Sequence, residues 1–148
     1  MKMETRPSIR AIEEEIVEEF ALFDDWESKY EYIIDMGRQL ASLDASYKTD
    51  AHRIHGCQST VWVASEYLDG RMQFHADADA MIVKGLVSML IRVLSGQTPD
   101  DILNTELEFI DRIGMTSHLA QTRSNGLRAM VRQMKLDTAA WKLKQQNP

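Results

Sequence analysis

The sequence predicts an α+β fold in which a small antiparallel sheet of about three strands packs with several helices. Near both ends of the chain, apolar residues recur every three or four positions, which is the period of amphipathic helices. Between residues 51 and 76 the pattern becomes strand-like around the turn signal Asp69-Gly70. Helical patterns therefore precede and follow one block of strands, an order typical of α+β proteins rather than of parallel βαβ proteins.

Composition limits the class of protein. The chain has 148 residues, 44% of them hydrophobic, so we expect one domain spanning residues 1–148. The formal net charge of −6 and the lack of a basic run argue against a nucleic-acid partner. No apolar stretch is long enough to cross a bilayer, and residues 1–8 lack the apolar segment of a secretory signal. We expect a cytoplasmic protein with no membrane partner.

Two amphipathic helices are predicted before the strands. The apolar stripe of the first consists of Ile9, Ile12, Ile16, Phe20 and Phe23. Its glutamates suggest a solvated face, and a docking surface for a partner is the alternative. Asp24 is predicted to cap the second helix, whose apolar face carries Tyr30, Ile33, Ile34 and Leu40.

Three strands are predicted next, at Ala51–Ile54, Val61–Leu68 and Arg71–Ala76. If Leu68 pairs with Arg71 across the Asp69-Gly70 turn, the pleat directs one set of apolar side chains toward the core. This set is Val61, Val63, Tyr67, Met72 and Phe74. Trp62 then lies on the more polar face, where it either covers or contacts a functional group or simply packs under a helix.

Helices complete the predicted fold. Asp79 is expected to cap a helix that runs to about Ser95, is apolar on nearly every side and belongs in the middle of the fold. Lys84 is its one charge near the start, and we expect the amine to reach the surface. Short helices follow at Pro99 and near residues 107–113. Residues 115–122 are predicted to form a loop, and a final amphipathic helix is predicted to start at about Arg123.

The most informative residue is Cys57, the only cysteine of the chain. A single thiol excludes an internal disulfide and a metal cage built from several thiolates. Cys57 lies in the segment Gly56-Cys57-Gln58-Ser59-Thr60-Val61-Trp62. Glycine permits unusual backbone conformations, and the small polar residues leave amides free to face a thiolate. A reactive sulfur on a mobile loop is therefore the functional interpretation, and a buried inert thiol is the alternative.

These residues resemble the SufE family of sulfur-acceptor proteins, whose cysteine loop reads Gly-Cys-Gln-Ser-x-Val-Trp. Residues 26–37 are similar to the family's Trp-Glu-x-Lys-Tyr-x-Tyr-Ile-Ile-x-x-Gly helix. Residues 77–86, then His118-Leu119, then residues 123–127 follow in the family's order. The resemblance thus spans most of the chain and implies a fold like that of SufE and of the IscU scaffold.

The resemblance also implies a function. A pyridoxal-phosphate-dependent cysteine desulfurase of the SufS or CsdA kind would pass persulfide sulfur to Cys57. The chain would stimulate turnover of that enzyme and deliver sulfur to an iron–sulfur cluster-assembly scaffold, while being no enzyme itself and holding no cofactor. Gly56, Gln58, Ser59, Trp62 and Arg123 are then expected to form the loop and to contact the sulfur or the partner.

The residues alone leave alternatives for the function and for single residues. An IscU-like cluster scaffold would need several thiolates around iron, and a regulatory adaptor would bind the desulfurase without taking sulfur. His52 and His55 with Cys57 superficially suggest a metal site. Residues three apart on a strand point to opposite faces, however, so no metal site is predicted. For Arg123 the alternative is an ordinary surface salt bridge.

Overall fold

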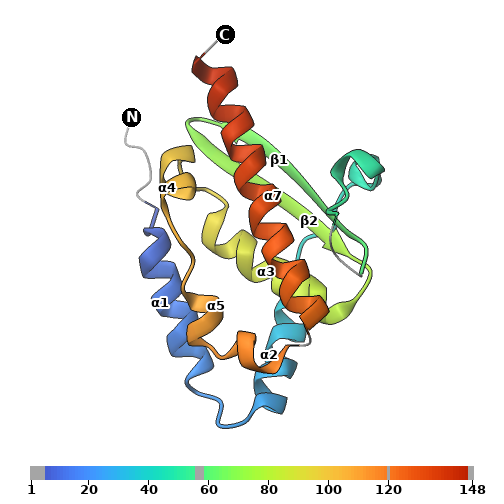
Figure 1. The fold of residues 1–148 in the computed structure, drawn as a ribbon, viewed down its shortest axis with the longest axis vertical. Helices are drawn as coiled ribbons and strands as arrows, with labels where there is room; N and C mark the ends of the chain where they lie inside the picture. Colours follow the sequence, from blue (N-terminus) through green and yellow to red (C-terminus); the bar gives the residue numbers. More distant parts are fainter. Residues whose placement is uncertain (1–5, 56–58, 120, 147–148) are drawn as a thin grey trace.

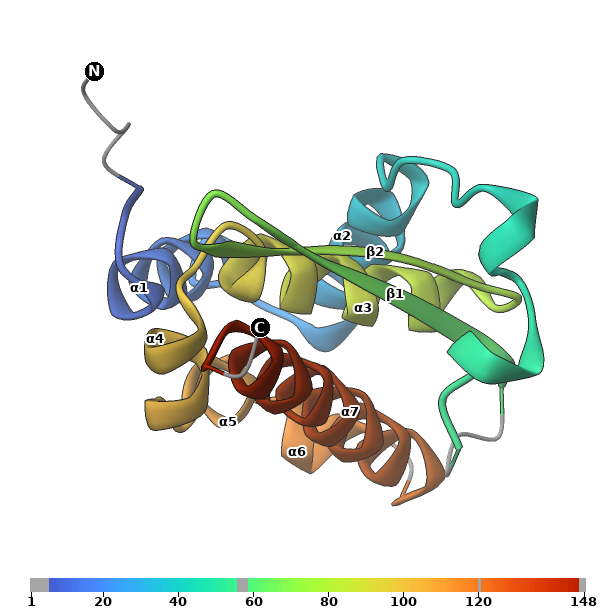
Figure 2. The same cartoon turned by 90° about the horizontal axis from the view of Figure 1, so that it is seen from above.

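The computed structural model describes residues 6–55, 59–119 and 121–146, and it has the predicted α+β architecture (Figure 1). Two helices come first, and a helical block follows a β-hairpin. The elements are α1 (Ile9–Phe20), α2 (Trp26–Arg38), β1 (Val61–Leu68), β2 (Arg71–Ala78), α3 (Met81–Leu94), α4 (Pro99–Asn104), α5 (Phe109–Arg112), α6 (Met115–His118) and α7 (Gln121–Gln146). Viewed from above, the hairpin runs alongside α3, and α7 lies beneath both (Figure 2).

The hairpin has the predicted register, with Leu68 opposite Arg71 and Val61 opposite Ala78. Both turn residues have positive φ, 52° at Asp69 and 81° at Gly70, as a tight two-residue hairpin requires. One face of the hairpin is buried, because Val61, Val63, Met72 and Phe74 are at most 3% exposed. The predicted assignment of side chains to the two faces is therefore correct.

The predicted third strand is wrong: within the described residues the sheet has two strands. Asp50–His52 is a short 3₁₀ helix, in which the His52 amide donates to the carbonyl of Thr49 over 3.1 Å. Only Arg53 then pairs with β1, as an isolated bridge to Trp62. The polar residues at the start of this segment favour a turn, so too few extended residues remain to form a strand.

Helix ends differ from the predictions at several places. Asp25, not Asp24, caps α2 by accepting a hydrogen bond of 2.7 Å from the Ser28 amide. Ala80 rather than Asp79 precedes α3, and it provides no side-chain cap. The predicted loop at residues 115–122 contains α6, and α7 begins at Gln121. At α2 the cap is the adjacent aspartate, and before α3 the side chain of Asp79 accepts a hydrogen bond from the Thr60 amide instead.

Helix α3 lies at the centre of the fold, in contact with α1, α2, α7 and β2. Nine of its residues are buried, as its nearly continuous apolar sequence predicts: Ile82, Val83, Gly85, Leu86, Val87, Met89, Leu90, Val93 and Leu94. The helix ends before Gly96, whose φ of 84° lets the chain turn back toward α4. Burial on all sides makes α3 the element against which the others are placed.

Helices α2 and α3 touch through glycines. A Cβ atom added to Gly85 would lie 2.0 Å from the carbonyl oxygen of Ile33, and one added to Gly37 would lie 2.7 Å from the Gly85 amide nitrogen. These separations are far below van der Waals contact, and the obstructing atoms belong to backbone. Only glycine at these two positions permits the two helix backbones to approach so closely.

Polar interactions join α1 to the rest of the helical layer. The carboxylate of Glu13, which is fully buried, accepts hydrogen bonds from the amides of Glu108 and Phe109 at 2.6 and 2.9 Å. Glu19 pairs with Arg92 of α3 at 2.5 Å and accepts the hydroxyl of Tyr32. Burial and the bond to Glu19 raise the pKa of Tyr32 to about 12. Buried groups are therefore paired where α1 meets α2, α3 and α5.

We predict that Gly85→Ala destabilises the fold by about 2 kcal/mol or more, because the new methyl group collides with the Ile33 carbonyl and must separate α2 from α3. The higher helix propensity of alanine offsets part of this loss. Urea denaturation measures the change. Ser88→Ala, on the same helix, is the control, since it adds no atoms and removes one hydrogen bond, worth about 1 kcal/mol. Equal stability of Gly85→Ala and the parent would contradict the prediction.

Candidate functional site

The candidate site is centred on the segment that carries the single cysteine. Gly56, Cys57 and Gln58 lie outside the described residues, whereas the structure describes the chain on both sides of them. On the upstream side, Ile54 is buried, and its amide donates to the carbonyl of Val61 over 2.8 Å. This bond joins the chain just before the cysteine segment to the first residue of β1.

The downstream end is fixed by two hydrogen bonds between Thr60 and Asp79. The Asp79 amide donates to the Thr60 carbonyl over 3.1 Å, and the Thr60 amide donates to Oδ1 of Asp79 over 3.1 Å. Asp79 directly follows β2. Its carboxylate binds the Thr60 amide at the end of the cysteine segment and does not provide the predicted cap of α3. Sequence reasoning missed this role, although Asp79 lies in the segment that resembles the SufE family. Its bonding partner is 19 positions away.

Trp62 lies on the polar face of the hairpin, as predicted, and faces a cluster of charges. Asp77 is its partner in the β1–β2 register. The Lys48 amine lies 5.6 Å from the centroid of the Trp62 ring, within the range of a cation–π contact, and 3.0 Å from Asp77 Oδ2. The Lys84 amine lies 3.3 Å from Asp77 Oδ1. Lys84, whose side chain is partly exposed, therefore pairs with a largely buried carboxylate, a partner that the sequence did not indicate.

The charge state of this cluster follows from its contacts. Burial of the Asp77 carboxyl raises its pKa, but hydrogen bonds from Lys48, the Ala78 amide and Lys84 outweigh burial and lower the pKa below its usual value. Asp77 is thus ionised at neutral pH and forms ion pairs with both Lys48 and Lys84. Because the folded pKa is depressed, this group stabilises the fold above its unfolded pKa, and the contribution is lost as pH falls through the folded pKa.

Arg123 lies in the first turn of α7 and is half-buried. Its Nη1 donates to the hydroxyl of Tyr30 across 3.5 Å, at the outer limit of a hydrogen bond. Nearby, the Trp26 ring stacks on His118 with centroids 4.6 Å apart. The start of α2 therefore meets the α6–α7 junction. Within the described residues Arg123 thus has a long contact with the Tyr30 hydroxyl and forms no salt bridge of the kind that the alternative interpretation expects.

The two histidines before the cysteine have different surroundings. The His52 ring lies edge-on to Tyr47, with centroids 5.2 Å apart, and its Nδ1 is 3.2 Å from the Thr49 hydroxyl. His55 is exposed. Within the described ranges, no three His, Cys, Asp or Glu side chains are grouped so as to hold a metal ion.

A polar cavity of about 470 Å³ adjoins the upstream side of the segment. His52, Arg53 and His55 line one wall, and Asp137 and Trp141 of α7 line another. A hydrogen-bonded chain fixes the α7 wall to β1, since Trp141 Nε1 donates to the Ser65 hydroxyl over 3.3 Å and that hydroxyl donates to Asp137 over 3.4 Å. The sequence did not indicate that Trp141 lies beside the cysteine segment.

Comparison with known proteins identifies the family. A family profile described as "SufE: Fe-S metabolism associated domain" matches residues 14–138. The chain belongs to the SufE family. An uncharacterised SufE-like protein of Rhizobium meliloti (strain 1021) is 33% identical over 127 residues, which are 82% of this chain and 91% of the relative. The matched range includes Cys57 and Arg123, so the predicted family is confirmed.

A solved structure is similar in fold. The solution structure of a hypothetical protein from Thermus thermophilus superposes with a TM-score of 0.73 and 18% sequence identity, covering 87% of this chain and 94% of the other. At that identity the likeness concerns the fold alone. Among the described residues, no helix is both long enough and apolar enough to span a membrane.

We predict that Asp79→Ala makes Cys57 more reactive toward iodoacetamide, because the substitution removes the carboxylate that holds the Thr60 amide at the end of the cysteine segment. A rise of several-fold in the alkylation rate, followed by mass spectrometry, is the expected result. Asp35→Ala is the matched control, since Asp35 is an exposed aspartate that pairs with Arg38 on α2. If both variants react at the parental rate, the Thr60–Asp79 contact does not govern access to the thiol.

Proposed function

We propose that this member of the SufE family accepts persulfide sulfur on Cys57 from a pyridoxal-phosphate-dependent cysteine desulfurase of the SufS or CsdA kind. It stimulates turnover of that enzyme and passes the sulfur to a scaffold for iron–sulfur cluster assembly in the cytoplasm. The family is associated with iron–sulfur metabolism. The observation that carries the proposal is the only thiol of the chain, placed in the family's cysteine motif between two hydrogen-bonded anchors.

The transfer is a thiol exchange. The Cys57 thiolate attacks the outer sulfur of the donor persulfide, the bond between the two donor sulfurs breaks, and the donor cysteine leaves as a thiolate. The product is a Cys57 persulfide, and no external oxidant or reductant is needed. The chain itself supplies a nucleophile and its surroundings, and the desulfurase supplies the chemistry that releases sulfur from cysteine.

A free thiol with a pKa of about 8.5 is mostly protonated at neutral pH, so transfer benefits from a nearby cation. The amines of Lys48 and Lys84 are both ion-paired with Asp77. Arg123, in contrast, makes just the long contact with Tyr30 among the described residues. Arg123 is therefore the cation that we propose acts on the thiolate, on the persulfide or on the partner.

Gly56, Gln58, Ser59 and Trp62 complete the proposed site. Ser59 is half-buried, and Trp62 is half-buried on the polar face of the hairpin under the Lys48 amine. We propose that the two anchors keep the ends of the segment in place while Gly56 allows the thiol to move toward the partner. Anchored ends with a mobile centre reconcile protection of a reactive persulfide with delivery to another active site.

Two other functions are less well supported. An iron–sulfur scaffold like IscU needs several thiolates, and this chain has one cysteine. A regulatory adaptor would bind the desulfurase in the same way but would not accept sulfur. A single substitution of the cysteine separates the adaptor from the carrier.

We predict that Cys57→Ser leaves folding and desulfurase binding intact but removes stimulation of desulfurase turnover, because a hydroxyl cannot accept the persulfide sulfur. The measurements are sulfide release from cysteine by the desulfurase, with binding followed by calorimetry. Mass spectrometry of the parent chain after incubation with desulfurase and cysteine should show added sulfur on Cys57. Full stimulation by Cys57→Ser would instead establish the adaptor.

We predict that Arg123→Ala lowers the rate of sulfur transfer to Cys57 several-fold while changing the free energy of unfolding by less than about 1 kcal/mol. The long contact with Tyr30 explains the small effect on stability. Tyr30→Phe is the control, because it removes the hydroxyl that Arg123 contacts and leaves the guanidinium. If Tyr30→Phe slows transfer equally, Arg123 acts by holding α7 against α2 and not on the sulfur or the partner.

A further inference from the structure

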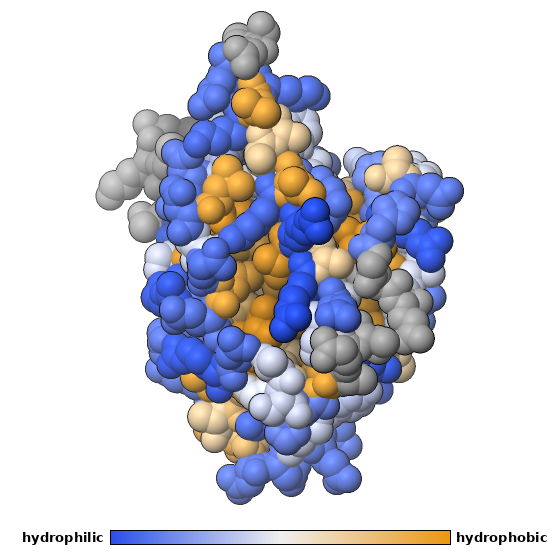
Figure 3. Space-filling view, viewed as in Figure 1, coloured by the Kyte–Doolittle hydropathy of each residue, from blue (hydrophilic) through white to orange (hydrophobic). Residues whose placement is uncertain are grey.

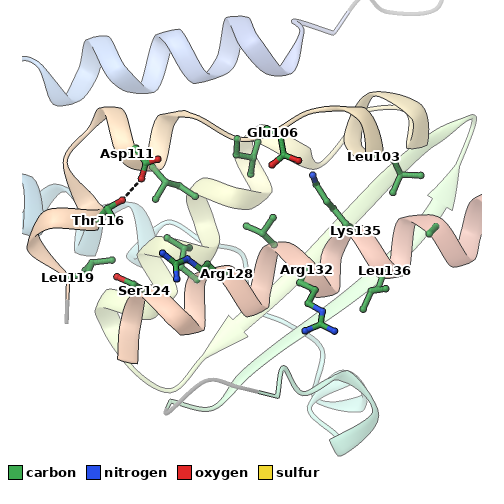
Figure 4. Close-up of a pocket in the computed structure, with 15 residues that line it drawn as sticks. Leu103, Glu106, Asp111, Thr116, Leu119, Ser124, Arg128, Arg132, Lys135 and Leu136 are labelled. Atoms are coloured by element: carbon green, nitrogen blue, oxygen red, sulfur yellow. Dashed lines mark hydrogen bonds between the residues drawn. The ribbon is translucent and has the colours of Figure 1, made fainter. Parts of the chain in front are cut away.

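A groove of about 650 Å³ runs along the outer side of α7, between this helix and the segment from α4 to α6 (Figure 4). Its floor is aliphatic, with Leu107 and Ile110 on one side and Leu127 and Val131 of α7 on the other. On the surface, apolar side chains gather in this region and are bordered by strongly polar ones (Figure 3). The proposed sulfur-transfer site uses none of these residues.

The edge of the groove formed by α7 is positively charged. Arg128 and Arg132 are exposed, lie one helical turn apart, and have no hydrogen bond or ion pair within the described parts of the chain. Like charges at this spacing weakly destabilise a helix. Other described arginines, such as Arg10, Arg92 and Arg112, pair with carboxylates. The chain has a net charge of −6, so two unpaired cations beside an apolar groove are unusual for it and favour binding of an anionic partner there.

The opposite edge of the groove, on the α4–α5 side, is negatively charged. Glu106 lies in the connection between α4 and α5, and Asp111 lies in α5, where it accepts the Thr116 hydroxyl. The Lys135 amine extends from α7 to the carbonyl of Thr105 over 2.8 Å and so links the two edges (Figure 4). The groove is therefore apolar along its floor, cationic along α7 and anionic along the α4–α5 side.

The dimensions indicate what can fill the groove. Its α7 wall extends from Ser124 to Ala139, about 15 residues or roughly 22 Å of helix. A partner helix of about four turns matches this length, and its side chains at helical spacing match an aliphatic floor. An alkyl chain with one anionic head group would use the cations but would leave the charge asymmetry of the two edges without a role.

We propose that the groove along α7 binds an amphipathic helix of a partner protein, with its apolar face on the floor and an acidic flank against Arg128 and Arg132. The flank that faces Glu106 and Asp111 is neutral or basic. This asymmetry fixes the direction of the bound helix as well as its composition. The proposal concerns binding alone and does not depend on sulfur transfer by Cys57.

The test is selection from a displayed library of helical peptides of about 16 residues. Apolar residues are fixed at helical spacing, and both flanks vary among Glu, Lys and Gln. The immobilised full-length chain should enrich peptides with Glu on one flank only. Fluorescence anisotropy then measures the affinity of an enriched peptide for the chain and its variants, at low and high salt.

Matched variants locate the binding. Leu136→Glu should weaken binding on the order of tenfold, because Leu136 lines the groove and is 54% exposed. Leu143→Glu, on the same helix but outside the groove lining and 60% exposed, should have no effect. Arg132→Glu should also weaken binding on the order of tenfold, with Arg38→Glu of α2 as the control for charge. All four side chains are exposed, and urea denaturation checks that the fold is retained.

Several results would overturn the proposal. Failure to enrich any peptide whose binding requires Leu136 would do so, as would enrichment without one acidic flank. Binding of dodecanoate, but of no peptide, with the same dependence on Leu136 and Arg132 would assign the groove to an anionic amphiphile. Self-association in sedimentation equilibrium that is lost in Leu136→Glu but not in Leu143→Glu would assign it to a second copy of this chain.

Discussion

The architecture depends on the direct approach of the α2 and α3 backbones at Gly37 and Gly85. Any side chain at Gly85 would overlap the Ile33 carbonyl, so this contact sets how deeply α3 lies in the fold. Because α3 is buried on nearly every side, its position determines where the hairpin and α7 pack against it. The same contact places the start of α2, with Trp26 and Tyr30, against the α6–α7 junction. A shift between the two helices would therefore reach Arg123 as well as the core.

The hairpin divides its two faces between stability and function. Its inner face is apolar and buried, whereas its outer face carries Trp62 and Asp77, and Asp77 pairs with Lys48 and with Lys84 of α3. The Thr60–Asp79 and Ile54–Val61 hydrogen bonds tie the cysteine segment to the ends of the same hairpin. Fixed anchors on both sides are compatible with the movement of the thiol that the proposed function requires.

Helix α7 takes part in the core and in two hollows of the surface. One side of α7 is buried in the core through Leu127, Met130 and Met134. Another side lines the polar cavity beside the cysteine segment with Asp137 and Trp141. The other edge of the helix, with Arg128 and Leu136, lines the aliphatic groove. Arg128, Arg132 and Leu136 on that edge are exposed, beside the short helices α4, α5 and α6. One long helix thus separates the proposed sulfur-transfer site from the proposed docking groove.

By itself the sequence determined the α+β order, the register of the hairpin, the central place of α3 and the SufE family. These features follow from the Asp69-Gly70 turn, from apolar periodicity and from motifs of adjacent residues, all of which are local. The tertiary structure alone decided that Asp79 holds Thr60 and does not cap α3, that Lys84 pairs with Asp77, and that residues 51–54 form no strand. It also decided that α7 borders both a polar cavity and an aliphatic groove. A carboxylate or an amide can form hydrogen bonds of similar free energy with several partners nearby in the sequence. Packing alone brings a distant partner within hydrogen-bonding distance and so decides which bond forms.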